Sequence, residues 1–250
     1  MRVAALYDIH GNLPALEAVL GDLRRAEVEV IVIGGDVVPG PMPSETLDRL
    51  LDVARDTRVQ FIQGNGETAA LAEISGTGAD AVPEQYRGIV RWVAEQLTPA
   101  QQRLLASCPK TLRLRVEGLG DVLFCHATPR SDTEIFTRTT SEDRLLLLFA
   151  EANASTVVCG HTHMQFDRMV GGIRVINAGS VGMPYGEPGA DWLLLGPGIE
   201  LRHTPYDLAK AAERIQRTNY PQAKEFAEHY VLRPPSEVEM LDALRRAELK

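Results

Sequence analysis

Five short motifs between residues 8 and 163 contain side chains that could bind metal ions. Carboxylate, amide and imidazole groups without thiolates are typical ligands of Mn, Fe, Co, Ni or Zn ions. Two such ions held close together can polarise a phosphate ester and activate a water molecule. The motifs are Asp8-Ile9-His10-Gly11-Asn12, Gly34-Gly35-Asp36, Gly64-Asn65-Gly66-Glu67, His126 and Gly160-His161-Thr162-His163.

Each motif follows a short apolar run that predicts a β-strand, at residues 2–7, 30–33, 59–62, 122–125 and 155–159. Ligands of open α/β sheets bind beyond the carboxyl ends of the strands, so we expect the motifs to meet there. Asp8 and His10 are two residues apart, as are His161 and His163. In an extended segment such side chains share a face, so one metal ion could bind both Asp8 and His10. The neighbouring glycines allow sharp turns and leave room for substrate.

These residues resemble the calcineurin-like metallophosphoesterase superfamily, in particular its small bacterial and archaeal phosphodiesterases. The superfamily pattern is D-x-H, G-D, G-N-H-[DE], a lone H and G-H-x-H, and the motifs occur here in that order. Residues 177–182 also resemble the superfamily segment that follows the last His pair. The resemblance implies an α/β fold in which two mixed β-sheets pack as a sandwich with helices outside.

The same resemblance implies a site for two divalent metal ions, most often Mn, with Fe, Zn, Ni or Co as alternatives. One ion would be bound by Asp8, His10 and His163, the other by Asn65, His126 and His161, with Asp36 shared. Asp36, Asn65 and His126 would be the catalytic residues. A hydroxide that bridges the two ions would attack the phosphorus of a phosphomonoester or phosphodiester. Hydrogen bonds from Asn12, Gly35 and Asn177 would orient these ligands.

The third motif departs from the superfamily pattern at one position. The usual His after the Asn, which is thought to protonate the leaving group, is Gly66 in this chain. Glu67 keeps the acidic position and could substitute as the acid, but a role at a helix N-terminus is the simpler interpretation. The metal ligands are therefore all present, whereas the proton donor is not identified by the pattern.

Length and composition favour a single metallophosphoesterase domain over residues 1–250, with a helical insert at 67–107 and C-terminal helices at 207–249. No apolar run reaches the ~18 residues of a membrane span, and the N-terminus lacks a leader-like segment, so we expect a cytoplasmic protein. The net charge of −8 argues against strong binding to duplex nucleic acid. A small phosphorylated substrate is the expected partner, and homo-oligomerisation stays open.

Apolar periodicity and turn residues predict the remaining elements. Within the insert, helices break at residues 75–78 and restart at Thr98-Pro99. The early strands alternate with helices, whereas the later strands form hairpins, and this order is typical of a mixed-sheet fold. We expect further helices at 13–25, 44–54 and 141–151, and hairpins at 112–116 with 122–125, 166–170 with 173–176, and 192–195 with 199–203.

Several chemically capable residues have ordinary interpretations. His203 and His229 lie outside every motif, Arg130 and Arg138 suit salt bridges as well as phosphate binding, and the three cysteines suit unpaired thiols. Two other functions compete with phosphoesterase activity. One is a binding scaffold that keeps the fold without the chemistry, as a retromer subunit of the same superfamily does. The other is a metal-dependent hydrolase of non-phosphate esters.

Overall fold

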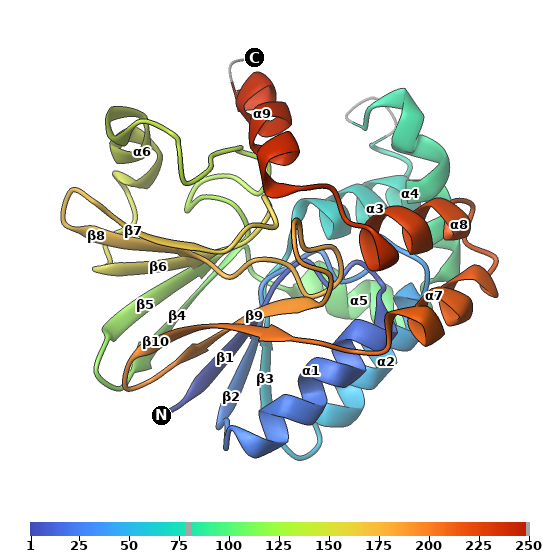
Figure 1. Ribbon diagram of the computed structural model, residues 1–250, viewed down its shortest axis with the longest axis horizontal. Coiled ribbons are helices and arrows are strands. Elements are labelled where there is room, and N and C mark those ends of the chain that lie inside the picture. Colours follow the sequence, from blue (N-terminus) through green and yellow to red (C-terminus); the bar gives the residue numbers. More distant parts are fainter. Residues whose placement is uncertain (79–81, 249–250) are drawn as a thin grey trace.

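Two mixed five-stranded sheets face each other in the computed structural model, which describes residues 1–78 and 82–248 (Figure 1). The strand order is β10-β9-β1-β2-β3 in the first sheet and β4-β5-β6-β8-β7 in the second. The predicted sandwich of two mixed sheets is therefore confirmed. The strands are β1 (Val3–Leu6), β2 (Val30–Ile33), β3 (Arg58–Phe61), β4 (Thr111–Val116), β5 (Gly120–Cys125), β6 (Thr156–Cys159), β7 (Phe166–Val170), β8 (Ile173–Asn177), β9 (Ala190–Leu195) and β10 (Ile199–Thr204).

The helices cover the outer faces of the sheets and one end of the sandwich (Figure 1). Those expected from the sequence are present, whereas the short α8 and the π-helix η1 were not predicted. Residues 79–81 of the expected insert, and residue 249 of the last expected helix, lie outside the described residues. The helices are α1 (Leu13–Arg25), α2 (Pro43–Val53), α3 (Asn65–Ser75), α4 (Glu84–Gln96), α5 (Pro99–Ser107), α6 (Glu142–Phe149), α7 (Leu208–Gln216), α8 (Ala223–Phe226), η1 (Ala227–Leu232) and α9 (Glu237–Glu248).

The core follows from the period of two along each strand. In β1, Val3 and Ala5 pack between the two sheets, whereas Ala4 and Leu6 pack against the helices. Because both faces of this strand are covered, its four residues are all buried, as its continuous apolar run predicts. The second sheet has a matching outer core beneath α6. These layers fix the strand ends from which the predicted ligands project.

Strand direction explains why the motifs can meet. Strands β1, β2 and β3 are parallel to one another, and so are β5, β6 and β8 in the other sheet. The carboxyl ends of these strands face the end of the sandwich where α3, α4, α8 and η1 gather (Figure 1). Segments from the middle and the end of the chain therefore surround the same edge as the five motifs.

None of the helices in the described ranges combines the length and the apolar composition that crossing a bilayer requires. The organisation of residues 1–250 as one domain stays a prediction.

Candidate metal centre

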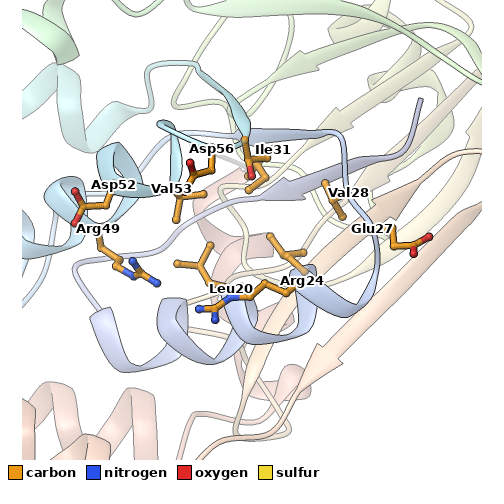
Figure 2. Close-up of a pocket in the computed structure, with 11 residues that line it drawn as sticks. Leu20, Arg24, Glu27, Val28, Ile31, Arg49, Asp52, Val53 and Asp56 are labelled. Carbon is orange, nitrogen blue, oxygen red and sulfur yellow. The ribbon is translucent and has the colours of Figure 1, made fainter.

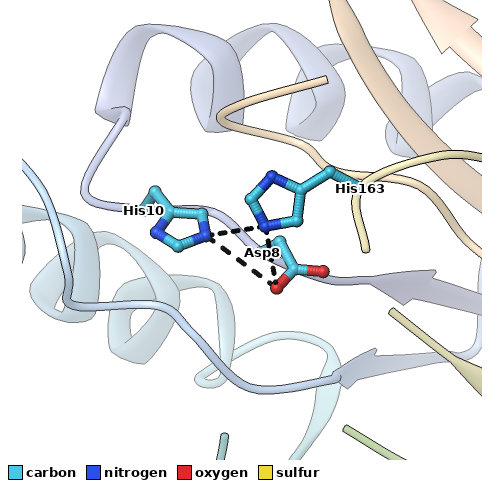
Figure 3. Close-up of side chains that lie close together, drawn as sticks. All are labelled: Asp8, His10 and His163. Atoms are coloured by element: carbon cyan, nitrogen blue, oxygen red, sulfur yellow. Dashed lines mark hydrogen bonds and ion pairs between the residues drawn. The ribbon is translucent and has the colours of Figure 1, made fainter. Parts of the chain in front are cut away.

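The seven predicted ligands converge between the two sheets. Ligand atoms of Asp8, His10 and His163 lie within 4.8 Å of one another (Figure 3), and the same holds for Asp8, Asp36 and His126. The remaining two predicted ligands lie beside His126. Its Nε2 atom is 3.0 Å from Oδ1 of Asn65, and its ring centroid is 5.2 Å from that of His161. The structure thus brings all seven side chains into one cluster.

The backbone reaches this arrangement through left-handed turns. Five of the predicted ligands have positive φ angles: Asp8 (53°), His10 (49°), Asp36 (52°), His161 (67°) and His163 (57°). Strand β1 ends at Leu6, so Asp8 and His10 do not lie on an extended segment, and our reason for their pairing was wrong although they do meet. Left-handed backbone is costly for residues other than glycine and is found mostly at functional sites. The strain therefore marks this loop cluster independently of the side chains.

Backbone carbonyl groups orient three of the imidazoles. The Nδ1 atom of His10 bonds the carbonyl of Pro39 at 3.0 Å, that of His126 bonds Gly34 at 2.9 Å, and that of His163 bonds Met183 at 2.9 Å. A carbonyl oxygen can only accept, so each Nδ1 atom carries the proton. Each Nε2 atom then presents a lone pair to the cluster when the ring is neutral, which is the tautomer of a metal-bound histidine.

Electron-pair donors face one another at the centre of the cluster. Oδ1 of Asp8 lies 3.5 Å from Nε2 of His163, 3.8 Å from that of His126 and 3.9 Å from that of His10. This oxygen is buried, and no hydrogen-bond donor from residues 1–78 or 82–248 satisfies it. The Nε2 atoms of His10 and His163 approach to 3.1 Å. Buried acceptors without donors are costly, and a divalent cation would satisfy all of them together.

Charges within the cluster set the protonation states. Burial acts to raise the pKa of Asp8, but the imidazoles of His163 and His126 outweigh it and lower that pKa. Burial and the neighbouring His163 lower the pKa of His10, and burial and His126 lower the pKa of His161 to about 4. Burial also opposes protonation of His126, yet the nearby carboxylates raise its pKa. The shifts of Asp8, His10 and His161 favour the ionised carboxylate and neutral imidazoles that bind metal, whereas His126 would give up a proton when a cation binds.

Glu67 joins two of the ligand-bearing loops. Its carboxylate accepts hydrogen bonds from the backbone N–H groups of Asp36 (2.8 Å), Val37 (2.7 Å), Val38 (3.2 Å) and Gly64 (2.9 Å). The side chain is 1% exposed, and burial together with the charge of Asp36 raises its pKa. Glu67 therefore has the expected position at the start of α3 and ties that helix to the loop after β2.

Two of the three residues expected to orient the ligands bind through side-chain amides. Asn177 donates to the carbonyl of Gly160 at 2.7 Å and to Oγ1 of Thr162 at 3.1 Å, which anchors the loop between His161 and His163. Asn12 accepts from the N–H of Ala15 and donates to the carbonyl of Gly182, so it both caps α1 and holds the segment after β8.

The third, Gly35, acts through its backbone. Its carbonyl accepts the N–H of Asp8 at 3.1 Å. Its φ is 93°, and a Cβ atom there would lie 2.6 Å from the backbone N of Gly64. Only glycine lets these two loops approach so closely. The carbonyl acceptors Pro39 and Met183 gave no sequence signal, because any residue type supplies a carbonyl.

A cavity of about 510 Å³ opens directly onto the cluster and is lined by His10, Asp36 and Asn65. Its outer walls come from α3, α4, α8 and η1. Figure 2 shows a different cavity, of about 460 Å³, between α1 and α2. Its lining, which includes Arg24 and Arg49, contains none of the seven predicted ligands. The first cavity is therefore the one from which a substrate would reach the cluster.

The structure gives a steric reason for Gly66. A Cβ atom on this residue would lie 2.0 Å from Cγ of Pro39 and 2.9 Å from Oδ1 of Asp36. The N–H of Gly66 also donates to Oδ1 of Asp36 at 2.7 Å. The pyrrolidine ring of Pro39 thus fills the space in which a side chain at position 66 would begin. The missing histidine and this proline are two parts of one local packing arrangement.

A histidine at position 66 should consequently require a change at position 39. We expect Gly66→His alone to lower the melting temperature without a gain in activity, because the clash is with a rigid ring. The double variant Pro39→Gly with Gly66→His should fold, since glycine keeps the carbonyl that orients His10. It should also turn over esters with poor leaving groups faster, because a general acid contributes about a hundred- to ten-thousand-fold.

The measurement is a leaving-group series from alkyl to nitrophenyl esters, run on the wild type, both single variants and the double variant. Pro39→Gly alone is the matched control, and its rate should still fall steeply as the leaving group becomes poorer. A flat dependence in the wild type, or no change in the double variant, would show that another group supplies the proton.

The other residues considered from the sequence have ordinary environments. Arg130 pairs with Glu134 and lines a small cavity next to His126, whereas Arg138 pairs with Glu237. His203 hydrogen-bonds Asp191 at 2.8 Å. His229 is exposed. Cys108, Cys125 and Cys159 are all unpaired, as predicted.

Comparison with known proteins agrees with this geometry. Residues 1–195 match the calcineurin-like phosphoesterase superfamily domain. The chain belongs to this superfamily. Its members with similar structures include a metallophosphoesterase from Sphaerobacter thermophilus, which is 24% identical with a TM-score of 0.69 over 92% of this chain and 99% of that one. Membership of this superfamily suggests a phosphoester hydrolase, and the clustered residues could bind metal.

Two further similar proteins extend over nearly the whole chain. Uncharacterized protein MJ0912 from Methanocaldococcus jannaschii is 26% identical over 240 residues, which is 88% of this chain and 94% of that protein. The hypothetical protein PH1004 from Pyrococcus horikoshii OT3 is 18% identical, with a TM-score of 0.80 over 94% of this chain and 99% of that one. The shared fold therefore includes the C-terminal region beyond residue 195.

Proposed function

We propose that the protein is a two-metal phosphoesterase that hydrolyses a phosphate ester of a small molecule. The observation that carries this proposal is the convergence of the buried, unsatisfied Oδ1 of Asp8 with three imidazole Nε2 atoms. Such a donor set fits a cation, and the adjoining cavity gives a substrate access to it. When bound, two divalent ions would supply Lewis acidity and an activated water for attack at phosphorus. Mn²⁺ is the ion we expect, with Fe, Zn, Ni or Co as alternatives.

The seven clustered side chains would divide between the two ions. Asp8, His10 and His163 would hold one ion, while Asn65, His126 and His161 would hold the other. Asp36 lies between the two groups, because its Oδ1 is 3.6 Å from Nε2 of His126 and its Oδ2 is 3.9 Å from Nε2 of His10. These distances support a shared role for its carboxylate, which would also set the spacing of the ions.

Three of these residues would also contact the reacting group. Asp36 and Asn65 line the large cavity, and His126 lines a smaller neighbouring cavity of about 120 Å³. They are thus the catalytic residues in this proposal. Nδ1–H of His126, bonded to the carbonyl of Gly34, keeps its ring fixed during turnover.

A panel of nitrophenyl esters tests the proposal. We expect the purified protein with added manganese to hydrolyse nitrophenyl phosphate, bis(nitrophenyl) phosphate or both, and to leave nitrophenyl acetate intact. Hydrolysis of the acetate alone would favour an ester hydrolase of another class. Stoichiometric metal binding without hydrolysis of any phosphate ester would favour a binding scaffold and contradict the proposed activity.

A further inference from the structure

We propose that the 510 Å³ cavity holds the aromatic part of a phosphate ester that carries no negative charge apart from its phosphate. This inference rests on the proposed function and specifies its substrate class. Any group that fills the cavity must be attached to the phosphate at the metal centre, because His10, Asp36 and Asn65 form part of the cavity lining. The polarity and charge of the remaining lining residues therefore indicate which kind of alcohol group the substrate carries.

Aromatic rings form the outer wall of the cavity. Tyr220, Phe226 and Tyr230 come from the C-terminal segment, and Tyr86 comes from α4 on the opposite side. Ring centroids are 6.1 Å apart for Tyr220 and Phe226 and 5.5 Å apart for Phe226 and Tyr230. These spacings are within the range of favourable aromatic pairs, so the rings of this wall stabilise one another. An aromatic guest would gain the same edge and stacking contacts.

Aliphatic side chains complete the lining, among them Val82, Ile89, Val90 and Met183. Within the described part of the chain, the lining contains neither lysine nor arginine, and its carboxylates are Asp36 and Asp132. A second phosphate or a carboxylate on the substrate would therefore meet no cationic side chain of this lining, in which Asp132 is itself paired with Lys110, and its desolvation would be poorly compensated. The cavity volume is in the range of sites for small-molecule ligands.

The wall also has an unusual local structure. Tyr230 belongs to the π-helix η1, which directly continues α8 and contains Ala227–Leu232. Short π-helices occur frequently at functional sites, where the extra residue per turn redirects side chains. Tyr220, which also comes from the C-terminal segment, packs against Trp92 of α4 at a ring-centroid distance of 5.2 Å. The insert and the C-terminal region are thus packed together to form one pocket.

Non-hydrolysable phosphonates test the inference without requiring turnover. The manganese-loaded protein would be titrated by calorimetry with methyl-, benzyl-, cyclohexylmethyl- and 4-carboxybenzylphosphonate. We expect benzylphosphonate to bind at least about tenfold more tightly than methylphosphonate, because it buries a ring. It should also bind about twofold to tenfold more tightly than the cyclohexyl compound, because of aromatic contacts. The carboxybenzyl compound should lose most of this gain.

Two variants locate the effect. Tyr86→Ala changes a ring that is 49% exposed, so the fold should persist while the preference for benzyl over methyl falls severalfold. Ile89→Asp places a charge in the cavity and should abolish that preference. The matched controls are Leu147→Ala on α6 and Ile74→Asp on α3, both at exposed positions outside the cavity lining. Neither control should alter binding.

The outcomes separate this inference from the proposed function. Benzyl selectivity with no ester hydrolysis would support the pocket and contradict the enzyme. Hydrolysis of nitrophenyl phosphates with equal affinity for methyl and benzyl phosphonates would support the enzyme and overturn the pocket. Equal affinity for the benzyl and cyclohexylmethyl compounds, or tight binding of the carboxybenzyl compound, would overturn the aromatic, singly charged substrate class.

Discussion

Replacing Asp36 with asparagine should lower kcat by at least about a hundredfold while the fold stays intact. The carboxylate lies within 4 Å of Nε2 atoms in both groups of predicted ligands, so its charge would serve both ions. An amide would keep the size of the side chain and lose that charge. His163→Ala should have a comparable effect, because it removes an imidazole 3.5 Å from Oδ1 of Asp8.

Matched controls exist for both substitutions. Asp167 on β7 pairs with Arg174 at the surface, and His229 is exposed, so Asp167→Asn and His229→Ala should keep full activity. Steady-state kinetics with saturating manganese gives kcat, and circular dichroism checks the fold. A folded Asp36→Asn enzyme that retains more than about a tenth of the wild-type rate would contradict the shared role of this carboxylate.

Removing metal with a chelator should abolish activity and lower the melting temperature, and adding Mn²⁺ should restore both. Oδ1 of Asp8 is buried in the cluster without a hydrogen-bond donor, so a cation that binds the folded state offsets an existing cost. Ligand at a hundred times its Kd stabilises a folded protein by about 2.7 kcal/mol, which for a chain of this size raises Tm on the order of 5–10 °C.

Differential scanning fluorimetry of the chelated protein, titrated with Mn²⁺, measures the shift, and elemental analysis gives the stoichiometry. Asp8→Asn should reduce both, whereas the surface variant Asp167→Asn should reproduce the wild-type curve. Less than half an ion per chain after manganese loading, or chelated protein with undiminished turnover, would be incompatible with metal-dependent chemistry.

The sequence predicted where the ligands lie but not the backbone conformation that brings them together. Apolar runs located the strand ends, and parallel strands brought those ends together, so Asp8, Asp36 and His126 were expected at one edge. The left-handed φ angles were not expected, because non-glycine residues avoid that region unless tertiary contacts impose it. The hydrogen bonds of Asp8 and His10 to the carbonyls of Gly35 and Asp36 are such contacts.

The aromatic cavity could not be predicted from the sequence. Tyr86 and Tyr230 are separated by more than a hundred residues, and no periodic pattern links them. Helix α8 has four residues, which is too few for a recognisable apolar repeat. Whether η1 forms a π-helix or an α-helix depends on its packing against the rest of the fold. The helical insert expected at 67–107 lines the cavity, whereas the C-terminal part of the lining comes from α8, η1 and the segment before them, which lie between the two C-terminal helices that the sequence predicts.

The packing of Pro39 against Gly66 also constrains the order in which this site can change over evolutionary time. A histidine that arose first at position 66 would appear in a background where its Cβ overlaps a rigid ring, and selection would remove it. A small residue at position 39 would have to come first, at a stage when it offers no catalytic benefit. A chain that contains both Pro39 and Gly66 is therefore separated from the histidine-containing pattern by an intermediate that brings no immediate catalytic benefit.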